Sequence, residues 1–176
     1  MSHLIEPLQN KKLSLSNRLV MPPLASGKAD VNGYVTKNVL DHYDERTKGG
    51  YISLVIIEHC FVSNEGKASS NQLSIADDNT TEGLTKLVNL IHNNNTKVVI
   101  QINHAGSKAN EKVTGYTPVG PSKIANPNNG YVANELSTSE IENIQNYFAT
   151  AALRAKKAGA DGVEIHSAHG YLINQF

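Results

Sequence analysis

The 176-residue chain carries 16 basic and 16 acidic side chains, so its formal charge is zero and gives no global electrostatic basis for binding nucleic acid or an anionic membrane. Its hydrophobic content of 39% suits one domain with a core. The single cysteine, Cys60, excludes an internal disulfide and is expected to be a small buried strand residue. The sequence contains no apolar run typical of a signal peptide or a membrane span, and we expect a cytoplasmic protein.

The first part of the chain, residues 5–20, is typical of a short β-hairpin with Gln9 and Asn10 near its turn, placed at the bottom of a barrel. Four apolar, β-branched runs then recur along the sequence. They are continuous rather than alternating, which indicates strands covered on both faces in a parallel sheet. The expected strands are residues 18–24, 51–62, 96–106 and 159–168.

Helical segments separate these runs. Thr36 is expected to cap the first helix. The third begins with two overlapping capping boxes, Ser137 with Glu140 and Ser139 with Glu142, and has the clearest apolar stripe. The three helices are expected in residues 36–50, 79–95 and 137–160.

The repeated strand–helix order leaves two α/β architectures, a doubly wound open sheet and a (β/α)8 TIM barrel. The first strand–helix loop has no G-x-G-x-x-G pattern, which counts mildly against a dinucleotide-binding open sheet. A long segment rich in Gly, Pro and Asn, residues 107–136, follows the third strand. Long loops on this side of a strand are usually functional, and barrel enzymes have their active sites on this rim.

Polar side chains occur where the expected strands end. The carboxyl ends of parallel strands face one shared site, so we expect these side chains to converge. They are His59, Gln101, Asn103, His104, His166, His169 and Tyr171.

Taken singly, these residues allow several interpretations. His166 and His169 fit structural histidines, metal ligands, or hydrogen-bond donors to a substrate oxygen; no H-x-H or H-E-x-x-H spacing supports zinc. Tyr171 fits a packed aromatic or a proton donor. Gln101 lies in an apolar strand, where an unpaired amide is costly, so it needs either a polar group on a neighbouring strand or the edge of a heteroaromatic cofactor.

The chain resembles the old yellow enzyme family of FMN-dependent NAD(P)H:flavin oxidoreductases, whose fold is a (β/α)8 barrel. The resemblance covers nearly the whole chain, and the last block is the most specific. It implies that residues 1–176 form an incomplete TIM-barrel domain, the N-terminal half with four βα units after a β-hairpin. The blocks are "LSLSNRLVMPPLAS", "GYVTKNVLDHYDERTKGG", "LVIIEHCFVSNEGKA", "VVIQINHAGSKA", "PVGPS" and "AGADGVEIHSAHGYLINQF".

The resemblance implies FMN as the cofactor. Gln101 would hydrogen-bond the pyrimidine end of the flavin, and backbone groups near Ala25 would meet its N5 and O4 edge. His59 takes a position that closes on the ring and that usually holds a smaller residue. Better-known branches often carry Thr or Cys at the position of Ala25, so the NADH oxidase and dienoyl reductase branch is favoured. The residues along the flavin would be Pro22, Pro23, Leu24 and Ala25.

For catalysis, the resemblance implies an ene-reductase that transfers hydride from NADH or NADPH through FMN to an α,β-unsaturated carbonyl. His166 and His169 would bind the carbonyl oxygen and stabilise the charge that builds there, and Tyr171 would deliver the proton. The implied partner is therefore a small molecule with an activated alkene.

Four βα units are half of such a barrel, and the usual phosphate site after its seventh and eighth strands is missing. We therefore expect this chain to be inactive alone. A truncated product is favoured over a half-barrel completed by a second polypeptide or its own copy, and over a natural non-enzymatic remnant. The alternative function is a non-catalytic half-barrel that self-associates or binds a partner through its open sheet edges and apolar inner face.

Overall fold

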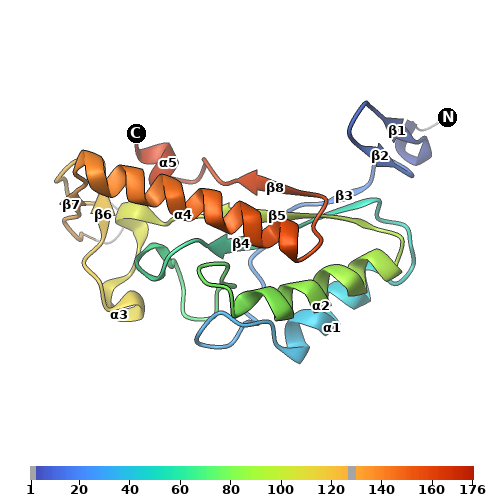
Figure 1. Cartoon of the computed structure of the whole chain (residues 1–176), viewed down its shortest axis with the longest axis horizontal. Helices are drawn as coiled ribbons and strands as arrows, with labels where there is room; N and C mark the ends of the chain where they lie inside the picture. The colour runs from blue at the N-terminus through green and yellow to red at the C-terminus, as the bar shows by residue number, and fades with distance from the viewer. Residues whose placement is uncertain (1–2, 127–129) are drawn as a thin grey trace.

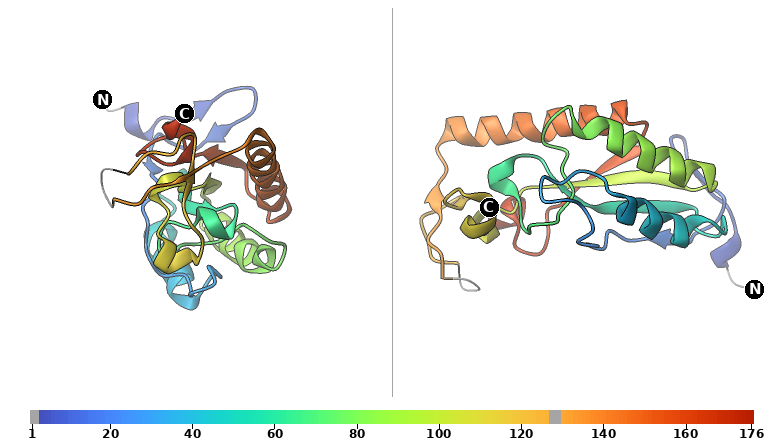
Figure 2. Two further views of the ribbon diagram at one scale, coloured as in Figure 1. Left: turned by 90° about the vertical axis from the view of Figure 1, so that its left-hand side faces the viewer. Right: turned by 90° about the horizontal axis from the view of Figure 1, so that it is seen from below.

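The computed structural model describes residues 3–126 and 130–176, and its centre is a parallel sheet in the order β3-β4-β5-β8. Three helices lie side by side along this sheet (Figures 1 and 2). The strand–helix order therefore confirms the expected α/β class. The strands are β3 (Val20–Met21), β4 (Leu54–Phe61), β5 (Lys97–Asn103) and β8 (Gly162–Ile165), and the helices are α1 (Lys37–Thr47), α2 (Thr80–Asn93) and α4 (Thr138–Lys157).

The N-terminal hairpin forms as expected, after a short 3-10 helix, η1 (His3–Ile5). Strand β1 (Leu8–Gln9) pairs antiparallel with β2 (Ser14–Leu15), and the side chain of Asn10 accepts hydrogen bonds within the turn. The hairpin lies at the end of the molecule from which the parallel strands start (Figure 1). It therefore occupies the bottom of the barrel, opposite the rim where the strands end.

Two strands differ from their expected form. Strand β3 covers only two residues because Pro22 and Pro23 follow it, and proline has no N–H for a sheet hydrogen bond. Strand β8 is not covered on both faces, since Val163 and Ile165 remain 37% and 55% exposed. Within the described residues β8 pairs with β5 alone, so its other edge has no neighbouring strand.

A β-bulge interrupts β4, where the register against β5 shifts between Ile57 and Cys60. The two residues inside the bulge are Glu58 and His59. A bulge changes the direction in which the neighbouring side chains point, and bulges are common beside active sites. Cys60 itself is fully buried, as expected.

The helix caps explain where α1 and α4 begin. The Thr36 hydroxyl accepts a hydrogen bond from the backbone N–H of Val39 at 3.3 Å. Ser137 and Glu140 form a reciprocal capping box. The second expected box, on Ser139, is wrong because Ser139 already lies inside the first turn of α4.

The core lies between the three helices and the sheet. Helix α2 places Leu84, Leu87, Val88 and Ile91 on one fully buried face. They pack in one cluster with strand residues such as Val55, Val98 and Ile100. This burial of apolar surface is the main force that holds the layers together.

The segment 107–136 is more regular than its composition suggested. Residues 127–129 lie outside the described part, but short elements occur on both sides of them. These elements, with one short helix after β4 and another after β8, form the rim at the carboxyl ends of the strands (Figure 1). They are η2 (Asn64–Gly66), η3 (Gly106–Lys108), α3 (Glu111–Thr114), the parallel pair β6 (Val119–Gly120) and β7 (Asn134–Glu135), and α5 (Leu172–Gln175).

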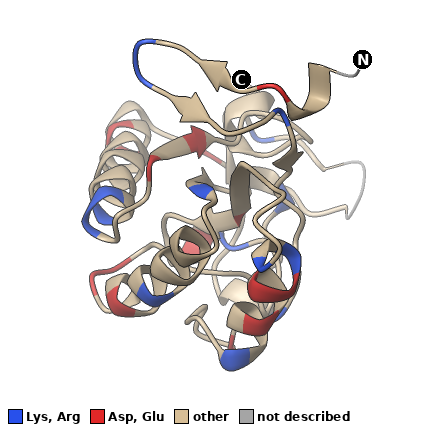
Figure 3. Ribbon diagram, turned by 90° about the vertical axis from the view of Figure 1, so that its right-hand side faces the viewer, with Lys and Arg blue, Asp and Glu red and all other residues tan. Residues whose placement is uncertain are grey.

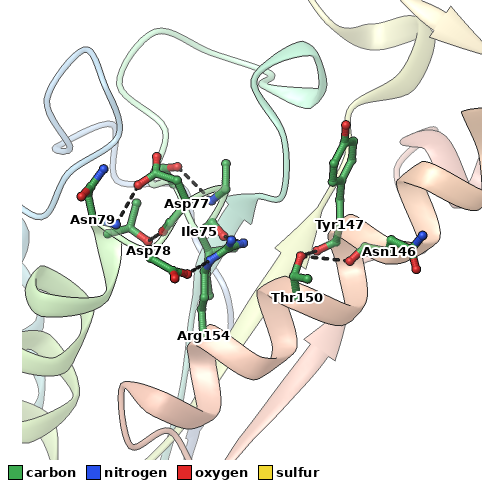
Figure 4. A network of polar contacts seen from close by, with 11 residues as sticks. Ile75, Asp77, Asp78, Asn79, Asn146, Tyr147, Thr150 and Arg154 are labelled. Atoms are coloured by element: carbon green, nitrogen blue, oxygen red, sulfur yellow. Dashed lines mark hydrogen bonds and ion pairs between the residues drawn. The ribbon is translucent and has the colours of Figure 1, made fainter.

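A polar tether joins α4 to the segment after β4 (Figure 4). Arg154 Nε donates to Asp78 Oδ1 at 2.7 Å, and Arg154 Nη1 donates to the carbonyl of Ile75 at 3.3 Å. Elsewhere positive and negative residues are interspersed along the ribbon, in keeping with the zero net charge (Figure 3).

Candidate functional site

Four aromatic side chains meet at the carboxyl ends of β4 and β8. The ring of His166 lies 5.3 Å from that of His169 and 4.8 Å from that of Tyr171, measured between centroids. His59 comes from the bulge in β4, with its ring 6.1 Å from His166. The Tyr171 hydroxyl lies 3.5 Å from His59 Nε2, a long hydrogen bond. Two chain segments more than 100 residues apart therefore build one cluster.

Burial controls the protonation of this cluster. It lowers the pKa of His59 to about 4, and the nearby His166 and His169 add to the effect. Burial, followed by the charge of His169, also lowers the pKa of His166. Burial raises the pKa of Tyr171. At neutral pH His59 and His166 are therefore neutral imidazoles and Tyr171 is a neutral phenol that can donate a proton.

The turn from His166 to Tyr171 fixes the spacing of these side chains. His166 Nδ1 accepts from the backbone N–H of Ala168 at 3.4 Å, which leaves its Nε2 as the N–H donor. His169 has φ 57°, a left-handed conformation uncommon outside glycine, and Gly170 follows with φ 66°. The turn thereby brings two histidines three positions apart, and the tyrosine beyond them, to the same rim.

Gln101 has a partner on a neighbouring strand. Its Nε2 donates to Glu164 Oε1 at 2.7 Å, across the β5–β8 pair. This is one of the two alternatives that the sequence left open. The amide oxygen of Gln101 accepts no hydrogen bond within the described residues, so the same side chain can still accept one from a cofactor.

The segment from Pro22 to Ala25 follows β3 at the same rim. Leu24 and Ala25 are exposed, and the backbone N–H of Ala25 donates to no group in the described part of the chain. A free amide donor here and a free amide oxygen on Gln101 match the acceptor and N–H groups along the edge of a flavin ring. These two groups, one donor and one acceptor, therefore fit an isoalloxazine ring.

Two expected members do not join the cluster. His104 is 1% exposed and its Nδ1 accepts from the backbone N–H of Gly106 at 3.0 Å. It packs so closely on Gly66 that a Cβ there would lie 2.5 Å from His104 Cδ2. Asn103 is also buried, and its side-chain oxygen accepts from Gln72 at 2.8 Å. Both side chains therefore lie in the interior beneath the rim and not in the cluster.

Three of the supporting side chains that sequence reasoning missed lie around this rim. Glu164 stands in an apolar strand beside Gln101, and that pattern could have indicated the pair. Lys108 Nζ donates to the carbonyl of His169 at 2.5 Å. Gln175 Nε2 donates to the carbonyls of Ala105 and Gly170, and Gln175 Oε1 accepts from Ser107. No local pattern marks these two.

Within residues 3–126 and 130–176, no group of three His, Cys, Asp or Glu side chains could hold a metal ion. The metal-ligand interpretation of the histidines therefore has no support in this part of the chain. None of the helices in the same residues has the length and apolar character needed to cross a membrane.

Two curated relatives share 40% identity with this chain. One is an NADH oxidase of Thermoanaerobacter brockii, matched over 93% of this chain and 25% of that protein. The other is an NADPH dehydrogenase of Clostridium acetobutylicum, matched over 94% of this chain and 48% of that protein. The chain thus spans a quarter to about half of the length of these relatives.

Solved structures agree on the fold. An old yellow enzyme homologue from Zymomonas mobilis matches with a TM-score of 0.91 at 30% identity, over 98% of this chain and 50% of that chain. Morphinone reductase in complex with tetrahydroNAD matches with a TM-score of 0.88 at 27% identity, over 99% and 52%. These matches confirm the N-terminal half of a TIM barrel.

The profile of one family matches residues 3–176, nearly the whole chain. FMN and NAD(P)H are the cofactors of that family. The chain belongs to the NADH:flavin oxidoreductase / NADH oxidase family, to which the old yellow enzymes are structurally similar.

Proposed function

We propose that the chain supplies the substrate-binding and proton-donating half of an FMN-dependent NAD(P)H oxidoreductase that reduces α,β-unsaturated carbonyl compounds. The observation that carries this proposal is the cluster of His166, His169 and Tyr171 at the barrel rim, within a chain of the flavin oxidoreductase family. Two neighbouring imidazole rings can bind a carbonyl oxygen through their ring nitrogens, and a phenol can protonate the α-carbon next to the carbonyl group.

FMN, when bound, supplies the hydride chemistry that connects NAD(P)H with the alkene. Gln101 and the backbone of Ala25 would hold the ring by the two free groups described above. His166 donates through Nε2 to the substrate carbonyl, and His169 adds a second donor. Tyr171 gives its proton to the α-carbon. The neutral phenol suits this role because burial raises its pKa and keeps the proton in place until it is needed.

The domain boundaries 1–176 and the expected cytoplasmic location stay predictions. The whole reaction is proposed for the protein to which these four βα units belong. In barrels of this kind the phosphate group is usually held by loops after the seventh and eighth strands. The four units described here are expected to hold the ring of FMN more firmly than its phosphate, and to be inactive alone.

A spectrum tests this proposal. The purified chain is incubated with FMN, free flavin is removed, and visible absorption is recorded. Retained flavin with a perturbed spectrum supports the ring site, and the Gln101→Leu variant should then lose flavin while the exposed Gln145→Leu variant on α4 keeps it. Equal retention by both variants contradicts the role of Gln101. A colourless wild-type chain refutes flavin binding by these four units.

A second candidate function is self-association as a half-barrel. Val163 and Ile165 leave apolar surface exposed on the free edge of β8. Beside them lies a groove of about 430 Å³. A second copy is the proposed occupant, because two four-stranded halves supply the eight strands that a closed barrel needs. The groove is lined by Leu136, Ile141, Ile144, Gln145, Phe148, Ile165, Leu172, Ile173 and Phe176.

Light scattering after size-exclusion chromatography tests the pairing. The wild-type chain should elute as a dimer, and Ile165→Lys should shift it to monomer. Leu153→Lys, an equally exposed change on α4, should leave the dimer intact. A monomeric wild-type chain would rule out the pairing.

A further inference from the structure

A buried carboxylate lies directly behind the segment proposed to meet the flavin. Glu58, in the bulge of β4, is 1% exposed. Within the described residues it forms no ion pair with a lysine or arginine. Burial raises the pKa of Glu58 and the charge of Lys28 offsets only part of that effect, so a carboxylate without an ion-paired cation needs several hydrogen bonds to satisfy it. The residues that donate those hydrogen bonds therefore indicate the role of the carboxylate.

All of the described donors to Glu58 come from one short turn. The backbone N–H of Ser26 donates to Oε2 at 2.7 Å, and the Ser26 hydroxyl donates to Oε1 at 2.5 Å. These are short, charge-assisted bonds of the stronger class. The carboxylate thus fixes the turn that immediately follows Ala25.

The backbone of Glu58 is also held by a hydrogen bond. The backbone N–H of Glu58 donates to the hydroxyl of Tyr43 at 2.9 Å, and Tyr43 is fully buried on α1. Gly27 has φ 62°, so the turn uses a left-handed conformation that glycine adopts without strain. Helix α1, strand β4 and the first strand–helix turn are therefore connected through one residue.

We propose that Glu58 is a positioning residue, which fixes the turn at Ser26 and Gly27 and so holds the free backbone N–H of Ala25 in place for the acceptor edge of the flavin. The inference rests on the proposed function for its ligand, and on the hydrogen bonds above for its geometry. His59, the other residue of the bulge, lies in the aromatic cluster with Tyr171. The bulge in β4 thus supplies one side chain to the turn after Ala25 and one to the aromatic cluster.

The first measurement is amide hydrogen exchange in the chain without FMN. In Glu58→Gln one carboxylate oxygen is replaced by an NH2 group that faces a donor, so the Ser26 amide should exchange at least tenfold faster than in wild type. Ser26→Ala keeps the carboxylate and removes only the hydroxyl donor, so it should give a smaller acceleration and a folded protein. Unchanged exchange at the Ser26 amide in both variants overturns the proposal.

The second measurement is FMN binding. Glu58→Gln should raise the dissociation constant at least tenfold and shift the absorption of the bound flavin, with Ser26→Ala intermediate. Ile91→Val, a buried change on α2 away from the turn, is the control for lowered stability and should alter neither. If the turn loosens but affinity and spectrum stay at wild-type values, Glu58 is structural only and the proposal fails. If the wild-type chain binds no FMN, the proposed function fails for this chain, while hydrogen exchange still decides whether Glu58 fixes the turn.

Discussion

Acid should destabilise this protein through His104, and the His104→Gln variant isolates the effect. Burial lowers the pKa of His104 from 6.5 to about 4. Its Nδ1 already accepts from the backbone N–H of Gly106, so a proton there would also break that bond. The unfolded chain binds the proton near pH 6.5 and the folded chain only near pH 4. Stability is therefore full above pH 6.5 and falls as the pH drops toward 4, by roughly 3 kcal/mol for a gap of this size.

Urea unfolding followed by circular dichroism at pH 7, 6, 5 and 4.5 measures this loss. His104→Gln should be less stable than wild type at pH 7, because it disturbs the packing on Gly66. Between pH 7 and 4.5 the free energy of unfolding of the variant should decrease less than that of wild type, by about 2–3 kcal/mol, since glutamine does not titrate. Other acid-titrating groups contribute to both proteins and cancel. Parallel curves for the two proteins would refute the reasoning.

Three further outcomes are expected. In the FMN-loaded enzyme, Tyr171→Phe should slow alkene reduction at least a hundredfold and spare flavin reduction by NAD(P)H, in stopped-flow absorbance; equal loss in both half-reactions contradicts the proton-donor role. Leu87→Ala should lower the free energy of unfolding by about 2–5 kcal/mol in urea titrations, because Leu87 is fully buried in the core; a change below 1 kcal/mol would be inconsistent with that burial. Ser137→Ala should cost about 1 kcal/mol by removing the capping box of α4, whereas Ser139→Ala should cost much less.

Helix α2 and the hairpin were predictable because local rules decide them. The apolar positions of α2 repeat at the helical period, and all four of the expected face are buried. The turn at Asn10 likewise depends on its own side chain. Where one residue could satisfy a rule in two ways, as with Ser137 and Ser139, the sequence could not choose, because the helix can start only once.

The residues of the aromatic cluster could be predicted from the sequence, but the side chains that support the cluster could not. His59 lies near the end of β4, and His166 and Tyr171 follow the end of β8, so the common edge of a parallel sheet brings them together. His104 also follows a strand end but turns into the interior, where the missing side chain of Gly66 leaves room for its ring. That outcome depends on a contact between residues far apart in the chain. Glu58 was missed for the same reason, since only the bulge reveals which way it points.

The three backbone contacts of Gln175 have a consequence for how this rim can vary in length. One amide joins η3 to the turn that carries His169 and Gly170, through hydrogen bonds to Ala105, Ser107 and Gly170. The start of the segment 107–136 is therefore coupled to the histidine turn. Asn126, in the later part of that segment, donates to the carbonyl of Ser107 at 3.0 Å, so this part is joined to the same contact. Leu136, at the end of the segment, also packs against Leu172, which directly follows Tyr171. A change in the length of this segment is thus expected to alter the spacing of the histidines and the tyrosine as well as the entrance to the site.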